Sequence, residues 1–331
     1  MLYDPDPSCV LKTSRNYNRK IKMDIRECFE KEPAILMEGA LGERLKREYG
    51  LTLDPYVDLG AMVYQPASKK ALKELWEEYI DIARKYALPF MATTPTRRSN
   101  KTRVYQGRYD EAIIKDNVEN LRSVGKASGI KMYAGGLMGC AGDAYTGKGC
   151  LSEAESEVFH RWEAELFKRA QADFIYAALI PALPEAAGIA KAVSYTGLPY
   201  IISFTIDKSG TLIDGTPLAE AIEYIDENAE KPPLCYMTNC IHPRHVMEAL
   251  EKDISQKEIV KRRFRGVQGN TSLLSYEELD NAKELKTADP ESFAEDMLKL
   301  KDVMDIKIFG GCCGTDSRHM EEIAKRLKGE V

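Results

Sequence analysis

The 331-residue sequence lacks any apolar run of roughly 18 residues, the length that a membrane-spanning helix needs. The N-terminus also lacks the apolar core of a signal peptide. Charge of one sign is not in excess, because 47 basic and 52 acidic residues leave a net charge of only -5. A nucleic-acid partner is therefore not expected. Together these absences predict a soluble, cytoplasmic protein that contacts neither membranes nor nucleic acids.

Cysteine is too sparse for a disulfide scaffold, with eight cysteines spread over 331 residues. In a reducing cytosol, free thiols serve as metal ligands, nucleophiles or core filler. Core filler is the expectation for Cys9, Cys28, Cys140, Cys150 and Cys235. A disulfide between Cys140 and Cys150 is a less favoured alternative.

The other three cysteines form a different pattern. Cys312 and Cys313 are adjacent and flanked by glycines, and Cys240 lies 72 positions before Cys312. Structural zinc sites normally take four protein ligands, whereas catalytic sites take three and keep one position open. The flanking glycines allow the backbone to bend, which two adjacent side chains need in order to reach one ion. The sequence therefore predicts a catalytic Zn²⁺ held by Cys240, Cys312 and Cys313.

The four histidines are weaker candidates for ligands. His242 is close to a cysteine, but the proline after it begins a turn, which weighs against ligation. His245 is expected to open a helix. His160 and His319 are expected to be solvated or lightly packed.

Short apolar runs alternate with helical patterns along the chain, as in parallel β/α units. Eight strands are predicted, over residues 35–38, 89–94, 131–135, 173–180, 199–205, 234–240, 264–269 and 306–310.

Amphipathic helices are predicted between these strands. One runs from Ser68, as its N-cap, to Tyr86, and another begins at a capping box formed by Ser152 and Glu155. Further helices are predicted over residues 110–128, 217–228, 245–251, 290–303 and 317–327.

Eight such units predict a single-domain α/β fold, a (β/α)₈ TIM barrel over residues 33–331, with its active site at the C-terminal ends of the strands. Cys240 ends the sixth strand, and the adjacent cysteines follow the eighth, so all three thiols reach one rim. A doubly wound sheet would instead separate these ends along an open edge. Residues 1–32 are predicted to be an N-terminal arm over the barrel bottom or over a neighbouring subunit of a homo-oligomer.

Motifs from Ile35 onward resemble those of the homocysteine S-methyltransferase family. The most specific are GGCCGT at residues 310–315 and TNC at residues 238–240. Weaker matches occur earlier in the chain, in the same order as in the family, at residues 38–42, 93–94, 135–137, 142–147, 203–205 and 214–216. The resemblance implies a zinc-dependent enzyme that methylates a small-molecule thiol, with homocysteine as the expected acceptor and methionine as the product. It also implies substrate contacts from Glu38, Gly39, Ala40, Thr94, Ala178 and Asn239.

The sequence departs from this family where the amino group of homocysteine is bound. Family members use one acidic residue in the first-strand motif and a second at the end of the fourth strand. Here Glu38 stands where aspartate is usual, and Ala178 takes the second position. Three explanations stay open: Glu185 or Asp207 compensates, the acceptor lacks an α-amino group, or the alignment is shifted by a few residues.

Zinc coordination ionises a thiol, so no catalytic residue is predicted beyond the metal site. Three methyl donors stay open at this point: a free sulfonium, a betaine-like quaternary amine and a separate corrinoid protein. The same chemistry could serve another acceptor thiol or demethylate a donor for a corrinoid partner. A zinc hydrolase is the alternative of another class, disfavoured because hydrolases prefer histidine ligands.

Two rim segments complete the predictions. The basic residues 94–103 are either a solvated loop or a contact for a substrate carboxylate or an acidic protein. The glycine-rich residues 135–149 could fold over the donor, with Tyr145 or Tyr105 facing a cationic methyl group.

Overall fold

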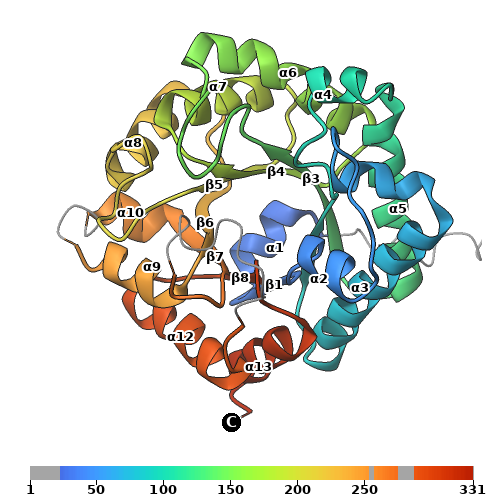
Figure 1. Cartoon of the computed structure of the whole chain (residues 1–331). Coiled ribbons are helices and arrows are strands. Elements are labelled where there is room, and N and C mark those ends of the chain that lie inside the picture. The colour runs from blue at the N-terminus through green and yellow to red at the C-terminus, as the bar shows by residue number, and fades with distance from the viewer. Residues whose placement is uncertain (1–22, 253–256, 275–286, 331) are drawn as a thin grey trace, which may run out of the picture.

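A computed structural model describes residues 23–252, 257–274 and 287–330 of the chain. Parallel strands follow one another around a closed barrel in chain order, so the predicted (β/α)₈ barrel is confirmed (Figure 1). Pairing of Ile35 with Ile308 closes it between the first and last strands. The strands are β1 Ile35–Met37, β2 Phe90–Thr93, β3 Met132–Gly139, β4 Phe174–Ile180, β5 Tyr200–Phe204, β6 Cys235–Ile241, β7 Phe264–Gly269 and β8 Ile308–Gly311.

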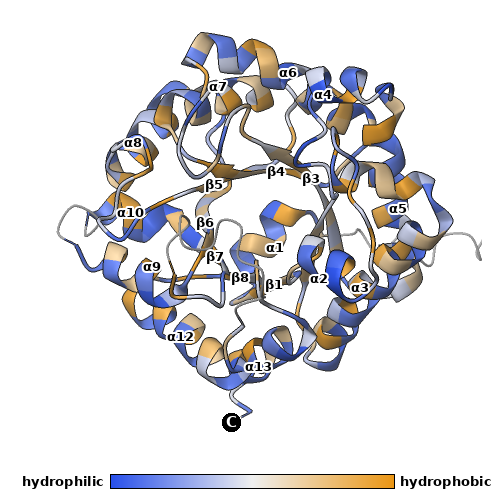
Figure 2. Cartoon of the chain, in the orientation of Figure 1, coloured by the Kyte–Doolittle hydropathy of each residue, from blue (hydrophilic) through white to orange (hydrophobic). Residues whose placement is uncertain are grey.

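Helices surround the strands, and hydrophilic residues gather on the outer side of this ring (Figure 2). Within the described residues, the structure contains no helix with the length and apolar character that crossing a bilayer requires. The helices are α1 Ile25–Lys31, α2 Gly42–Arg47, the 3₁₀ helix η2 Leu59–Tyr64, α3 Pro66–Lys85, α4 Lys101–Gln106, α5 Ala112–Ser128, α6 Glu153–Arg169, α7 Leu183–Ser194, α8 Leu218–Asn228, α9 Pro243–Leu250, α10 Glu258–Arg263, α12 Pro290–Val303 and α13 Ser317–Leu327.

Two predicted helix starts are wrong, and both errors involve proline. Helix α3 begins at Pro66 with Gln65 as its N-cap, so Ser68 lies inside the helix and is buried. Helix α9 begins at Pro243, so His245 does not open it. Proline suits the first helical position because an N–H group there would have no partner within the helix, so its absence loses no hydrogen bond. The predicted capping box at the start of α6 is confirmed.

Helix α1 lies across the N-terminal end of the barrel (Figure 1). Its Cys28 is buried in the apolar cluster inside the barrel. Lys307, just before β8, donates to the carbonyl of Phe29 at 2.8 Å, and Tyr133 of β3 donates to the carbonyl of Met23 at 3.0 Å. This end of the barrel is therefore sealed, and the opposite rim is the one that carries the cysteines. Residues 1–22 of the predicted arm lie outside the described residues.

Close packing between β3 and α6 depends on a glycine. A Cβ atom at Gly136 would lie 2.3 Å from Cδ1 of Phe167. We expect Gly136→Ala to lower the free energy of unfolding by about 1–3 kcal/mol, because a close-packed interior must shift to admit a methyl group. Gly42→Ala is the matched control, since its nearest neighbour would be Cδ1 of Leu59 at 3.4 Å. Urea unfolding of both variants measures the difference, and equal stabilities would contradict this account.

Candidate metal centre and substrate pocket

Three thiols meet at the C-terminal rim of the barrel. Cys240 lies near the end of β6, and Cys312 and Cys313 directly follow β8. Their sulfur atoms all lie within 4.8 Å of one another, and the sulfurs of Cys240 and Cys313 are 3.6 Å apart. Thiolates bound to a tetrahedral Zn²⁺ at about 2.3 Å are about 3.8 Å apart. The spacing and chemistry of these donors fit one zinc ion with its fourth position open.

Irregular backbone brings the sulfurs together. Cys240 has a φ of +64° at a register shift between β6 and β7, a conformation that few non-glycine residues adopt. After β8, Thr315 donates its N–H and its hydroxyl to the carbonyl of Cys312, which closes a tight turn. Gly314 has a φ of +82° in this turn. The bend frees the two adjacent cysteines from the opposite orientations that a regular strand would impose.

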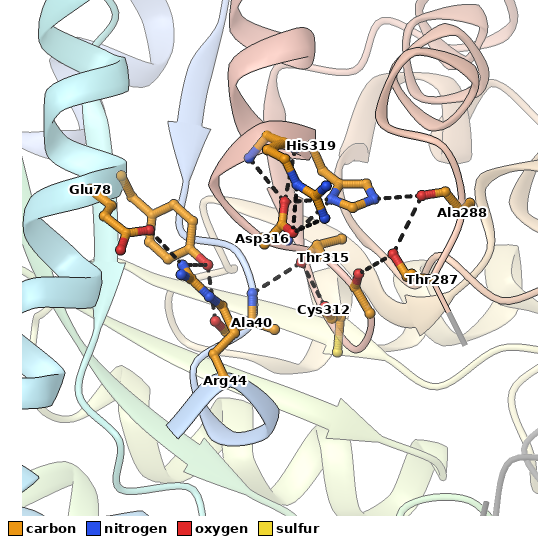
Figure 3. Close-up of polar contacts among 12 residues, drawn as sticks. Ala40, Arg44, Glu78, Thr287, Ala288, Cys312, Thr315, Asp316 and His319 are labelled. Carbon is orange, nitrogen blue, oxygen red and sulfur yellow. Dashed lines mark hydrogen bonds and ion pairs between the residues drawn. The ribbon is translucent and has the colours of Figure 1, made fainter. Parts of the chain in front are cut away.

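Neighbouring loops hold the cysteine turn from two sides (Figure 3). Thr315 accepts a hydrogen bond from the N–H of Ala40, which links the turn to the loop after β1 at 3.0 Å. The hydroxyl of Thr287 donates to the carbonyl of Gly314 at 3.0 Å. Asp316 then caps helix α13. The position of the adjacent cysteines is therefore set by contacts outside the cluster itself.

The metal-free thiols do not titrate independently. Hydrogen bonds from the Cys312 and Cys313 thiols lower the pKa of Cys240 well below its ordinary value. The same contacts with Cys240 raise the pKa of Cys312 and Cys313. Hydrogen bonding within the cluster therefore favours ionisation of Cys240 over ionisation of Cys312 or Cys313. Filling the site with a cation must displace the remaining protons.

A pocket of about 250 Å³ lies next to the cluster. Cys240, Cys312 and Cys313 line it, and so does every residue that was predicted to contact the substrate. Those residues are Glu38, Gly39, Ala40, Thr94, Ala178 and Asn239.

Glu38 is held inside this pocket with only 4% of its surface exposed. Both carboxylate oxygens accept the N–H of Thr93 at 2.9 Å, and the threonine hydroxyl donates to one of them at 2.5 Å. Burial nevertheless raises the pKa of Glu38 to about 8. The side chain is therefore mostly protonated at neutral pH and offers little negative charge.

Asn239 lines the pocket, but its side-chain oxygen is already engaged in hydrogen bonds within the protein. The oxygen accepts the N–H of Leu179 at 3.1 Å and the hydroxyl of Ser203 at 2.7 Å. Leu179 has a φ of +59° at a register shift in β4. Asn239 thus stabilises the irregular end of β4 beside Ala178.

The two acids proposed to compensate for Ala178 lie outside the pocket, whose acidic lining residues are Glu38, Glu43 and Asp58. Glu185 is buried elsewhere, where it accepts the N–H of Ala141 at 2.6 Å and lies 3.1 Å from His160. Asp207 is exposed in a turn with Ser209. Neither acid lines the pocket, so the expectation that one of them compensates is wrong.

The histidines lie outside the cysteine cluster among the described residues. His242 instead caps α9, where its ring nitrogen accepts the N–H of Arg244, and burial lowers its pKa to about 4. The expectation that His160 and His319 are solvated or lightly packed is wrong, because both side chains are fully buried. His160 lies between the buried acids Glu163 and Glu185. Helical periodicity does not predict this burial, because charged residues are normally assigned to the solvent-exposed face of a helix.

The loop after β3 places Tyr145 at the cluster. Its hydroxyl donates to the sulfur of Cys240 at 3.4 Å. Tyr105, the alternative, is 52% exposed, packs near Trp162 and does not line the pocket. Cys140 and Cys150 are free thiols near this loop, so the alternative of a disulfide between them is wrong.

Two of the cysteines that were expected to be core filler are confirmed in that role. Cys28 and Cys235 are buried in the apolar cluster inside the barrel. Cys9 lies outside the described residues.

Two supporting threonines were not predicted. Thr93 holds Glu38, and Thr315 links the first strand loop to the cysteine turn. Both lie inside motifs of the sequence, at residues 93–94 and 310–315, and membership of those motifs is the signal by which they could have been predicted.

Comparisons with known proteins identify the family and the fold. A family model described as homocysteine S-methyltransferase matches residues 35–327. The structure of the homocysteine methyltransferase MmuM from Escherichia coli in its metallated form has a TM-score of 0.72 at 20% identity, over 91% of this chain and 99% of that chain. The apo form of the same protein has a TM-score of 0.64 at 20% identity, over 90% and 97%. At this identity the likeness shows the barrel fold. No curated protein sequence matches the chain.

The sulfur cluster predicts a metal content. We expect purified protein to carry about one zinc per chain, and Cys240→Ser or Cys312→Ser to lose it, because two thiolates hold the ion poorly. Cys150→Ser is the control, since this thiol lies outside the cluster. Elemental analysis after dialysis measures the content. Full zinc occupancy in either cluster variant would contradict the assignment.

Burial of Glu38 predicts a pH dependence of stability. At pH values between the pKa of Glu38 in the unfolded chain, near 4.5, and its pKa in the folded protein, about 8, Glu38 carries a proton in the folded state that it lacks in the unfolded state. The free energy of unfolding should therefore fall as pH rises through this window, by up to about 1.4 kcal/mol per pH unit. Glu38→Gln should lack this slope and become relatively more stable at high pH. Urea unfolding of both zinc-loaded proteins tests this, and a difference that stays constant with pH would disprove it.

Proposed function

The chain belongs to the homocysteine S-methyltransferase family, and on that premise we propose that it binds Zn²⁺ through Cys240, Cys312 and Cys313 and methylates the sulfur of a small thiol. The observation that carries the proposal is the trio of sulfurs that lines a pocket of about 250 Å³. A site with three thiolate ligands keeps a coordination position for a fourth sulfur. The metallated form of the related E. coli protein supports the choice of a metal.

Bound zinc would supply the positive charge that lowers the pKa of an incoming thiol, so that its thiolate forms at neutral pH. The proton of the thiol leaves to solvent. The acceptor sulfur then attacks the donor's methyl carbon; a new C–S bond forms, and the leaving atom departs with the electron pair of the broken bond. Tyr145 stands beside Cys240 and faces this space.

Residues around the pocket disfavour a hydrolase. The three candidate ligands are all thiols, whereas hydrolytic zinc sites favour histidine ligands, and no histidine is present in the described lining. Tyr145 instead presents an aromatic ring, which suits a cationic methyl group. We therefore favour a free sulfonium or quaternary amine as donor, and a separate corrinoid protein is the alternative.

A specific observation favours an acceptor other than homocysteine. Ala178 lines the pocket and carries no charge, and the carboxyl group of Glu38 is mostly protonated at neutral pH. A buried ammonium group would therefore lack the paired carboxylates that usually compensate its desolvation. The second candidate acceptor is accordingly a thiol without an α-amino group.

Thiol binding to the zinc-loaded protein tests the proposal. Calorimetry under anaerobic conditions should show that small thiols bind only when zinc is present, and mass spectrometry with a sulfonium donor should detect the thioether. Cys313→Ser should abolish both signals, and Cys150→Ser should retain them. Binding that is unaffected by zinc removal would contradict the proposed function.

The two acceptors are distinguished by mercaptobutyrate, which is homocysteine without its amino group. A well-matched ammonium contact improves affinity by about tenfold to a hundredfold. We expect mercaptobutyrate to bind at least as tightly as homocysteine, because Ala178 offers the ammonium no partner. A tenfold or greater preference for homocysteine would exclude the second candidate and restore the first.

A further inference from the structure

Two arginines occupy the substrate pocket without an assigned role. Arg97 and Arg98 belong to the segment that follows β2, and both line the same pocket as the cysteine cluster. Neither is explained by methyl transfer to a thiol alone.

The segment that carries them is built into the protein. Thr94, Thr96 and Ser99 are fully buried. Thr96 donates its hydroxyl to the carbonyl of Leu137 at 2.8 Å, and the N–H of Leu137 donates to the hydroxyl of Thr94 at 3.1 Å. The prediction of a solvated loop is therefore wrong for residues 94–99, which are fastened to β3.

Strand β3 also makes room for the first arginine. A Cβ atom at Gly139 would lie 2.6 Å from the carbonyl oxygen of Arg97 and 2.7 Å from its Cγ. Only a residue without a side chain permits this approach. The arginine pair is thus placed by the close contact between the segment and the strand end.

The two guanidinium groups have no counter-charge in contact. Across the described parts of the chain, neither Arg97 nor Arg98 forms a hydrogen bond or an ion pair through its side chain. Burial, followed by the charges of Arg103 and Arg97, lowers the pKa of Arg98. By contrast, Lys46 of the same pocket is paired with Glu43 at 2.9 Å.

The acidic and amide groups of the pocket do not fill this gap. Glu38 is engaged by Thr93, and the carbonyl oxygen of Gln268 accepts the hydroxyl of Tyr176 at 2.8 Å. Asp58 lies near Arg98 and favours its charged form, but no ion pair joins them in the described structure. Glu43 is paired with Lys46 and Arg47, so among the described lining residues the two free guanidinium groups outnumber the one free carboxylate, that of Asp58. The unpaired charge of the pocket is therefore positive on balance, and it suits an anion.

We propose that Arg97 and Arg98 form a subsite for an anionic oxygen group, a sulfonate or a carboxylate, on the acceptor thiol. The acceptor is then a short thiol that carries this group and no ammonium, with its sulfur at the cysteine cluster and its anion at the arginines. A cationic methyl donor would be repelled by two guanidinium groups, so the acceptor is the better occupant. This inference rests on the proposed thiol-binding function.

Calorimetry on the zinc-loaded protein with a panel of thiols tests the subsite. The panel is mercaptoethanesulfonate and mercaptopropionate as anions, mercaptoethanol as the neutral thiol, aminoethanethiol as the cation, and homocysteine. We expect the anionic thiols to bind about tenfold or more tightly than mercaptoethanol, since charge-assisted hydrogen bonds to arginine favour them. Aminoethanethiol should bind most weakly. A weakening of the anionic thiols with added salt should accompany this order.

The double variant Arg97→Gln, Arg98→Gln should bring the ratio of anionic to neutral thiol affinity close to one. Lys101→Gln is the matched control, because it removes one charge from an exposed position just beyond the segment and should keep the ratio. Zinc content and circular dichroism establish that the double variant is folded, and the salt dependence of the unaltered protein gives an independent readout.

Several results would overturn the inference. Equal affinities for anionic and neutral thiols, an unchanged ratio in the double variant, or tightest binding of homocysteine would each refute the anion subsite while leaving thiol binding intact. If no thiol in the panel binds to the zinc-loaded protein, the proposed function fails together with the inference.

Discussion

Closure of the barrel determines whether Cys240 can share one ion with the adjacent Cys312 and Cys313, which lie more than 70 positions later in the chain. Cys240 arrives from β6, and Cys312 and Cys313 arrive from β8, with β7 paired between them. All parallel strands end at the same rim, so the ligands meet without a dedicated domain. The cost is local: Cys240 adopts a left-handed φ, and the chain after β8 bends at once. Such strain persists only where surrounding contacts hold it.

Those surrounding contacts connect the metal centre to substrate recognition. Asn239 supports the irregular end of β4 next to Ala178, and Thr315 joins the cysteine turn to the loop that follows Glu38. Thr96 fastens the segment of the arginine pair, which lines the same pocket, to β3. The same pocket is thus lined by three thiols, by the uncharged Ala178 and by the two arginines. This distribution of charge is what argues for an anionic acceptor.

Much of this architecture could be predicted from the sequence because strand ends, glycines and cysteines leave local signals. The alternation of strands and helices predicted the barrel, and the pattern of cysteines and glycines independently predicted Cys240, Cys312 and Cys313 as ligands. Contacts between distant side chains leave no such signal. The burial of His160 against Glu185, and the fastening of Thr96 to Leu137, depend on tertiary packing. Sequence reasoning therefore treated a buried histidine as solvated and left a structured arginine segment as an open alternative.

X-ray absorption at the zinc edge tests the central claim most directly, because it counts the sulfur atoms around the metal. The account predicts three sulfurs and one lighter atom at the resting site, and four sulfurs once an acceptor thiol binds. A resting site with nitrogen or oxygen in place of any of the three sulfurs would contradict it. So would a first shell that does not change when the thiol is added.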